Sequence, residues 1–212
     1  MRCHIIIDQS SSMYYPNKKE HPKLVYNKAE FSALASAVLL QILKKQRDAA
    51  GLSLYDDSHS FYAPEKGNER HFQMLLNTLE TLALSKPKAL KTQTYEVLHQ
   101  IAEQLHRRSM IILFTDMFQS TRDSKELFEA LRHLKHNKHE VVLFHVFDKD
   151  KELKFDFDNT PKRFIDVESG EFINLYPDTI KETYEDSVQS YFNELRLKCG
   201  QYGIKYVEAD VT

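Results

Sequence analysis

The sequence lacks the features that mark membrane and secreted proteins. No apolar run approaches the length of a membrane span, and Met1-Arg2 leads directly into an apolar run, unlike a signal peptide. Only two cysteines are present, Cys3 and Cys199, and neither has a partner at metal-ligand spacing. We therefore expect a cytoplasmic protein with two packed, reduced thiols and no membrane span.

An excess of charge of either sign is also missing. Lysine and arginine number 29 against 31 aspartate and glutamate residues, which leaves a formal charge of −2. Such a balance creates no long-range field for a polyanion, so we expect no nucleic-acid partner. At 212 residues and 42% hydrophobic content, the chain can bury one sizeable core. We predict a single domain over residues 1–212.

Several motifs of enzyme chemistry are absent as well. The chain has no His-Glu-x-x-His and no Gly-rich phosphate loop. His133, His136 and His139 are closely spaced, but they fall on a polar helix end and a loop, which favours solvated surface over a ligand set.

What the sequence does contain is an alternation of apolar strands and amphipathic helices. Strands are predicted at Ile5–Ile7, 52–55, 110–114, 141–147 and 204–207, and helices at about 26–46, 69–83, beyond Thr92, 124–136 and 178–199. This order predicts an α/β fold with a doubly wound, mostly parallel sheet. His59–Ala63 is expected to return as an antiparallel edge strand, and segments 153–157, 164–167 and 172–175 as a small β excursion at about 150–176.

In the helix at about 26–46, the apolar residues recur at helical spacing and indicate its packed face. They are Phe31, Leu34, Ala35, Val38, Leu39 and Ile42.

The strongest functional signal is the end of the first strand. The run Ile5–Ile7 stops at Asp8, and the hydroxyls of Ser10 and Ser12 follow at alternate positions. Carboxylate and hydroxyl oxygens are hard donors that suit Mg²⁺, with Mn²⁺ or Ca²⁺ as alternatives. A serine-rich turn that caps the next helix would give the same pattern, so the stretch alone leaves both interpretations open.

Two other loops repeat this pattern. The strand at 110–114 also leads to an acid, Asp116, and Thr92 stands just before a helix. In a doubly wound sheet the strands before Asp8 and Asp116 are expected side by side where the winding reverses, so these donors converge on one edge. We therefore predict a divalent cation site formed by Asp8, Ser10, Ser12, Thr92 and Asp116.

These residues carry a resemblance to a known family. Asp8-Gln9-Ser10-Ser11-Ser12 resembles the Asp-x-Ser-x-Ser signature of von Willebrand factor A (vWA) domains, and Thr92 and Asp116 match the threonine and second aspartate of their metal-ion-dependent adhesion site (MIDAS). Segments 51–55, 141–155 and 166–171 resemble the bacterial DUF58 family over essentially the whole chain. Members of that family often carry further sequence ahead of this domain.

The resemblance implies a Rossmann-like vWA fold and a role for each ligand. Ser10, Ser12 and Thr92 would bind the metal directly or nearly so, and Asp8 and Asp116 largely through water. Met117 stands where many such domains have glycine, and Gln93 and Tyr95 crowd the threonine loop. These departures concern the shape of the surface more than the ligand types.

The resemblance also implies a binding function rather than catalysis. Hydroxyl ligands neutralise the ion poorly, so a carboxylate from a partner protein could fill an open position, and family members often accompany MoxR-type AAA+ ATPases. Four neighbours of the site are expected to contact the partner, which would be such an ATPase or its client. Because the site is expected outside the core, Asp116→Ala should weaken binding and leave the fold intact. The four neighbours are Met13, Tyr14, Met117 and Phe118.

The alternative is a phosphatase or phosphotransferase with Asp8 as nucleophile. That chemistry requires a general acid two residues later, where this chain has Ser10. We therefore predict no catalytic residues. Asp148 and Glu152 are interpreted as turn residues, or as part of a second contact surface.

Overall fold

The computed structural model describes residues 1–16, 26–56, 59–86, 94–117, 124–136, 138–165 and 172–212. Six strands form one sheet in the order β3-β2-β1-β4-β5-β8. All neighbouring pairs are parallel except β2 and β3, as the sequence predicted for an antiparallel edge strand. The strands are β1 (Arg2–Asp8), β2 (Ala49–Tyr55), β3 (His59–Lys66), β4 (Met110–Thr115), β5 (Glu140–Phe147) and β8 (Lys205–Asp210).

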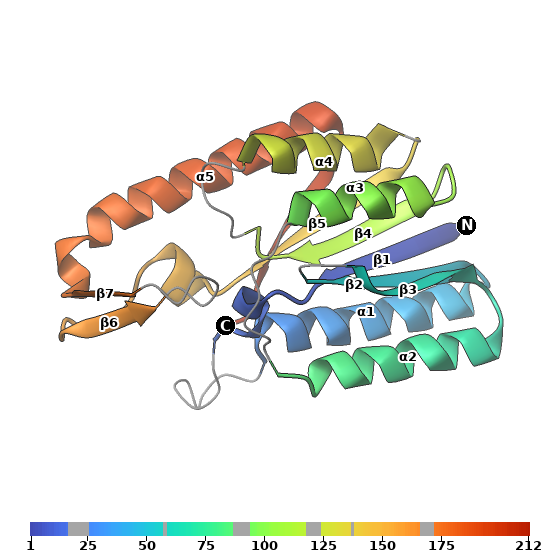
Figure 1. The fold of residues 1–212 in the computed structure, drawn as a ribbon, viewed down its shortest axis with the longest axis horizontal. Coiled ribbons are helices and arrows are strands. Elements are labelled where there is room, and N and C mark those ends of the chain that lie inside the picture. The colour runs from blue at the N-terminus through green and yellow to red at the C-terminus, as the bar shows by residue number, and fades with distance from the viewer. Residues whose placement is uncertain (17–25, 57–58, 87–93, 118–123, 137, 166–171) are drawn as a thin grey trace.

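Helices cover both faces of this sheet (Figure 1). Two of them, α1 (Lys28–Lys45) and α2 (Glu69–Ala83), pack on one face. The other face is covered by α3 (Thr94–Gln104), α4 (Ser124–His136) and α5 (Lys181–Tyr202). The predicted α/β, doubly wound architecture is therefore confirmed. Among the described residues, no helix has the length and apolar content needed to cross a membrane.

The sheet separates two apolar cores, and β1 contributes to both. Ile5 and Ile7 belong to the core beneath α1 and α2, whereas Ile6 belongs to the core beneath α3 and α4. This alternation follows from the period of two along a strand. It explains why β1 reads as an unbroken apolar run that ends only where the chain leaves the sheet.

Helix α1 differs from the sequence prediction in the face that it buries. Phe31, Ala35 and Leu39 pack against the core as predicted, although they are only partly buried. Leu34, Val38 and Ile42 are exposed, contrary to the prediction. The face against the sheet instead carries small residues together with two leucines, because small side chains let the helix approach the strands closely. Its buried residues are Lys28, Ala29, Ser32, Ala33, Ser36, Leu40 and Leu43.

The predicted β excursion contains one hairpin and one irregular segment. Strands β6 (Lys162–Ile165) and β7 (Phe172–Leu175) pair as an antiparallel hairpin beside the start of α5 (Figure 1). We expected a strand at residues 153–157, but these residues do not form one. A π-helical turn, η2 (Lys149–Leu153), is followed by Phe155, whose ring packs on Tyr184 of α5 with centroids 4.4 Å apart. Packing against α5 therefore overrides the alternating pattern.

Two short 3-10 helices complete the fold. The first, η1 (Ser11–Tyr14), directly follows the loop after β1, and the second, η3 (Pro177–Thr179), precedes α5. Helix α5 runs through Gly200 and ends at Gly203, whose φ of 67° places it in the left-handed region. Glycine adopts that conformation without the steric cost of a Cβ atom.

Candidate metal centre

Asp8 and Asp116 lie at the same edge of the sheet, as predicted. Strands β1 and β4 are parallel neighbours, with Ile7 opposite Phe114, and the two acids follow at their carboxyl ends. Strand order reverses here, because β2 and β3 continue to one side of β1 and β5 and β8 to the other side of β4. Ligand sites of open α/β sheets occur at such switch points.

The carboxylate of Asp8 connects the two loops. Its Oδ1 atom accepts a hydrogen bond from the backbone N–H of Ser10 at 2.9 Å, which shapes the loop after β1. Its Oδ2 atom accepts one from the hydroxyl of Thr115 at 2.8 Å. The Thr115 hydroxyl in turn accepts the N–H of Met117, so Asp8 orients the start of the loop after β4 as well.

The serines do not serve as a helix cap. Ser10 occupies the N-cap position of η1, but its side chain makes no capping hydrogen bond. Its hydroxyl lies 3.1 Å from the hydroxyl of Ser12 instead. Two hydroxyl oxygens are therefore side by side, next to the carboxylate of Asp8, which is the arrangement expected for ligands and not for a cap.

Burial disfavours the ionised form of Asp8 and Asp116. Asp8 and Asp116 are each 2% exposed. Loss of hydration, and then repulsion from Asp116, raise the pKa of Asp8 to about 6. Burial and the charge on Asp8 also raise the pKa of Tyr55 well above its usual value. The edge therefore concentrates negative charge in a poorly hydrated environment, where a cation is favoured.

Lys28, which sequence reasoning missed, and Glu152, which it interpreted differently, complete this acid cluster. The ammonium of Lys28, which is fully buried, lies 2.8 Å from Oδ2 of Asp116 and 2.6 Å from Oε1 of Glu152. Burial lowers the pKa of Lys28, but Asp116 and Glu152 outweigh that effect and raise it above the usual value. Burial raises the pKa of Glu152. Glu152 is thus part of the site, and the interpretation of it as a turn residue is incomplete.

The loop after β4 is held by groups from β5 and α5. The ring nitrogen Nε2 of His145 lies 2.9 Å from the carbonyl oxygen of Asp116, and Nδ1 lies 2.6 Å from the Tyr206 hydroxyl. Burial lowers the pKa of His145 to about 4, so the ring is neutral at pH 7. The hydroxyl of Tyr191 donates to the carbonyl oxygen of Met117 at 2.7 Å.

The predicted partner-contact residues are placed differently from our expectation. Met13 and Met117 are buried, so their side chains support the loops and do not form an exposed apolar rim. Met117 has a φ of 52°, the left-handed region that favours glycine, which accounts for the glycine that many related domains have here. Tyr14 is half-buried, with its hydroxyl 2.6 Å from that of Ser85. Phe118 lies outside the described residues.

The expectation that the site lies outside the core is wrong. Asp116 is buried against the ammonium of Lys28, so Asp116→Ala would leave a buried cation with one carboxylate fewer. Such a loss destabilises a protein, because the remaining charge is poorly hydrated. Asp116→Ala is therefore unsuitable for separating binding from folding.

Four of the five predicted ligands can be compared with the requirements of a cation. Two adjacent hydroxyls and two repelling carboxylates fit a hard divalent ion in donor type and charge. The fifth residue, Thr92, lies outside the described residues. Within the described ranges, no three histidine, cysteine, aspartate or glutamate side chains group in a way that could hold a metal. A site here thus depends on the serine hydroxyls.

In a second polar cluster, a histidine bridges a serine hydroxyl and a carboxylate, as in the catalytic triad of a serine hydrolase. His4 lies between Ser53 and Glu65, with its ring nitrogens 2.8 Å from the serine hydroxyl and 2.7 Å from the carboxylate. All three side chains are buried beneath neighbouring elements, so a substrate cannot reach Ser53. This cluster links β1, β2 and β3 by buried hydrogen bonds and does not support the hydrolase alternative.

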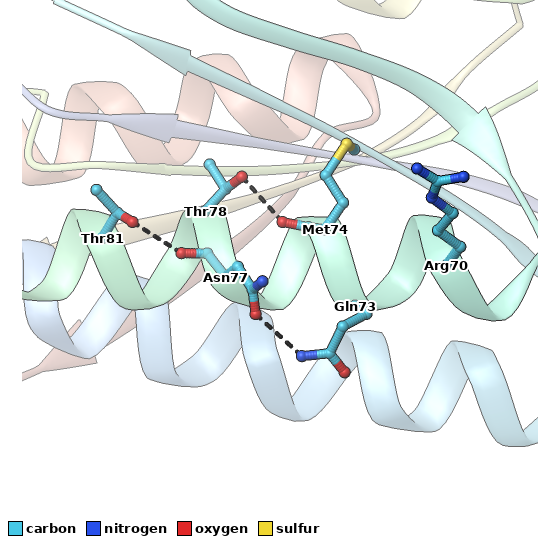
Figure 2. A pocket seen from close by; sticks show the side chains of 6 residues that line it. All are labelled: Arg70, Gln73, Met74, Asn77, Thr78 and Thr81. Atoms are coloured by element: carbon cyan, nitrogen blue, oxygen red, sulfur yellow. Dashed lines mark hydrogen bonds between the residues drawn. The ribbon is translucent and has the colours of Figure 1, made fainter.

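Two other features are also distinct from the candidate centre. His136 is exposed, as predicted, whereas His133 is half-buried with its Nδ1 2.8 Å from that of His99. His139 is buried, and its ring accepts the N–H of Ser109. The solvated-surface interpretation is therefore wrong for His139. A shallow pocket lies along α2, and its lining side chains hydrogen-bond within that helix (Figure 2). The lining residues are Arg70, Gln73, Met74, Asn77, Thr78 and Thr81.

Comparison with solved structures supports the fold. The chain is similar to the conserved hypothetical protein BatB from Bacteroides thetaiotaomicron, with 16% identity over 99% of this chain and 90% of that chain and a TM-score of 0.57. It is similar to an aerotolerance-related membrane protein from Bacteroides fragilis, with 16% identity over 99% and 92% of the two chains and a TM-score of 0.53. At these identities the similarity concerns the fold alone.

Comparison with protein families agrees with the resemblance seen in the sequence. No curated protein matched the chain. The family model described as "Protein of unknown function DUF58" matches residues 1–191, which is most of the chain. The protein accordingly belongs to the DUF58 family.

Proposed function

We propose that this protein is a non-enzymatic, metal-dependent protein-interaction domain. A divalent cation would be held by the hydroxyls of Ser10, Ser12 and Thr92, with Asp8 and Asp116 acting largely through water. The metal would supply an electrophilic position that a partner carboxylate can occupy. Mg²⁺ is the expected ion, with Mn²⁺ or Ca²⁺ as alternatives.

The observation that carries this proposal is the convergence of hydroxyls and acids at one edge. The hydroxyls of Ser10 and Ser12 are adjacent, and the neighbouring carboxylates of Asp8 and Asp116 repel each other strongly enough to affect the pKa of Asp8. Buried acids with a raised pKa in a strand-end loop are typical of functional sites, which supports a binding role for this edge.

Calorimetric titration with Mg²⁺ and Mn²⁺ tests the metal site. The wild type should bind one ion, and the double variant Ser10→Ala/Ser12→Ala should lose binding, because it removes two hydroxyl donors without altering charge. Ser187→Ala, an exposed serine on α5, is the matched control and should bind as the wild type does. Equal binding by the double variant and the control would contradict the proposed ligand set.

The proposed partner is a MoxR-type AAA+ ATPase or its client, as the family resemblance implies. Tyr14 is the predicted contact residue that is partly exposed, next to the serine loop. Co-purification with the cognate ATPase should succeed in Mg²⁺ and fail in EDTA, and it should fail with Ser10→Ala/Ser12→Ala. Binding that persists in EDTA would show that the partner uses another face. The cytoplasmic location expected from the cysteines also stays a prediction.

The enzymatic alternative makes an opposite prediction. Both carboxylate oxygens of Asp8 accept hydrogen bonds from the protein, and the residue two positions later is Ser10, which is a poor general acid. We therefore expect no turnover of generic phosphate and ester substrates. Turnover that is lost in Asp8→Asn would overturn the proposal.

A further inference from the structure

Lys28 occupies an unfavourable position for a lysine. It is the first residue of α1, where the helix dipole repels positive charge, and its side chain is fully buried. The helix start is fixed independently by a capping box, in which Asn27 and Glu30 bond each other's backbone N–H groups. Since neither hydration nor the helix dipole stabilises this ammonium, contacts with neighbouring groups must offset its burial, among them two acids and the Tyr15 ring, whose centroid lies 5.9 Å away.

Those acids come from segments far apart in the sequence. Asp116 is 88 residues away and Glu152 is 124 residues away, yet both carboxylates lie within 2.8 Å of the ammonium nitrogen. The Lys28 ammonium therefore joins the start of α1, the loop after β4 and the turn after β5 at one point. Removing one member of such a buried pair leaves a charge that is neither hydrated nor compensated, which costs far more than the loss of a surface pair.

Other contacts hold the Glu152 side chain and the backbone of Asp116. The second carboxylate oxygen of Glu152 accepts the N–H of Asp148 at 2.8 Å, and its carbonyl oxygen accepts the Tyr184 hydroxyl at 3.0 Å. The backbone of Asp116 is held by His145. The Glu152 carboxylate therefore stays in place if the ammonium is removed, and the backbone that carries the Asp116 carboxylate stays fixed.

We propose that Lys28 is a tethered cation that holds Asp116 and Glu152 together and competes with a divalent ion for Asp116. The first role is independent of the proposed metal site, whereas the second rests on it. The site thereby stays assembled without a metal ion, and its cation affinity is kept below what the acids alone would give.

Lys28→Met tests the first role, because methionine keeps much of the side-chain volume and removes the charge. Lys44→Met is the matched control: it lies on the same helix and removes an exposed pair with Glu69. In EDTA, Lys28→Met should lower the melting temperature by about 10 °C or more, and Lys44→Met by no more than about 2 °C. Similar small losses in both variants would overturn the proposal.

A double variant separates charge from packing. Glu152→Gln in the Lys28→Met background removes one of the two acids left without a counter-ion, so it should raise the melting temperature above that of Lys28→Met alone. Additive losses from Lys28→Met and Glu152→Gln would show that Lys28 acts by packing and would overturn the proposed charge role. If Lys28→Met alone fails to fold, refolding of the double variant is the expected result, and its failure counts against the proposal.

Mn²⁺ titration, followed by electron paramagnetic resonance, tests the competition. Lys28→Met, or the double variant if the single variant does not fold, should bind Mn²⁺ at least about tenfold more tightly than the wild type. Mn²⁺ should also raise the melting temperature of this variant by more than it raises the melting temperature of Lys44→Met. Equal affinities would overturn the competition. If neither protein binds Mn²⁺, the proposed function and the competition both fail, while the EDTA measurements still decide the tethering role.

Discussion

Replacing Asp8 with asparagine should stabilise the metal-free protein at neutral pH. The pKa of Asp8 is raised from 3.8 to about 6, first by burial and then by the charge on Asp116. Roughly two pKa units at about 1.4 kcal/mol each make the ionised carboxylate cost the folded state about 3 kcal/mol. Asparagine removes that charge and keeps the shape of the side chain.

Part of this gain is lost to hydrogen bonding. Asp8 accepts from the N–H of Ser10 and from the hydroxyl of Thr115, and the asparagine amide can accept only at its oxygen. A disturbed hydrogen bond costs about 1 kcal/mol. We therefore expect Asp8→Asn to raise the free energy of unfolding at pH 7.5 in EDTA by about 1–2 kcal/mol.

The effect of Asp8→Asn on the free energy of unfolding should depend on pH. Because the pKa of Asp8 is higher in the folded than in the unfolded state, the folded state binds more protons between about pH 4 and 6. The Asp8 contribution to the free energy of unfolding therefore falls as pH rises through that window. Below about pH 4 the wild type is protonated and gains nothing from the substitution, so the advantage of Asp8→Asn should disappear there.

Urea denaturation of the wild type and Asp8→Asn at pH 4, 5, 6 and 7.5 is the assay. Asp186→Asn, at an exposed aspartate on α5, is the control. The difference between its free energy of unfolding and that of the wild type should not change with pH. If Asp8→Asn is destabilising to the same extent at every pH, Asp8 is not under charge strain and the reasoning fails. With saturating Mg²⁺ the order should reverse, because only the wild type gains binding energy.

Three further predictions follow from burial. Leu40→Ala should lower the free energy of unfolding by about 2–5 kcal/mol, while Leu34→Ala on the exposed side of α1 should change it by less than about 1 kcal/mol, as urea denaturation would show; equal losses would contradict the face assigned to α1. Burial raises the pKa values of Cys3 and Cys199 to about 12, so both thiols should react with iodoacetamide at pH 8 much more slowly in the native protein than in urea; fast native labelling would place a thiol at the surface. Tyr191→Phe removes the hydrogen bond to the carbonyl oxygen of Met117, and we expect a loss of about 1 kcal/mol in urea denaturation; an unchanged midpoint would mean that the loop needs no such support.

Most of the fold could be predicted from periodicity, because each strand of the sheet is buried by its neighbours. The runs at Ile5–Ile7 and 110–114 are apolar on both sides, and they are the two central strands. Helices α2 and α4 begin and end at the predicted residues. The β excursion was less predictable, since Phe155 packs by aromatic contact with Tyr184 and not by strand pairing.

The packed face of α1 could not be predicted from apolar spacing. Its sequence places leucine, valine and isoleucine on one stripe, Leu34, Val38 and Ile42, and serine and alanine on the other. Periodicity favours the larger apolar residues, whereas close contact with a sheet favours small ones. The hydroxyl of Ser32 is satisfied within the helix by the carbonyl oxygen of Lys28, which removes the cost of burying it.

For the candidate site, sequence reasoning located the acids but missed the cation among them. Asp8 and Asp116 are recognisable because each ends an apolar strand, a local signal. Lys28 gives no such signal, since a lysine near a helix start reads as solvated surface, and its partners lie far away along the chain. A search for lysines at the first turn of a helix that packs on a sheet could have raised it as a candidate, because the dipole disfavours that position and some other group must compensate.

The presence of Lys28 changes what a metal could do at this edge. Among the described residues, the three buried carboxylates of Asp8, Asp116 and Glu152 lie near the single ammonium of Lys28, so within this part of the chain the acids outnumber the cation. A lysine alone therefore holds the loops without saturating the site, and a divalent ion would add binding energy without being needed for folding. That combination suits a domain whose partner binding is switched by a cation while its fold persists, because the ion then acts on affinity and not on the population of folded protein.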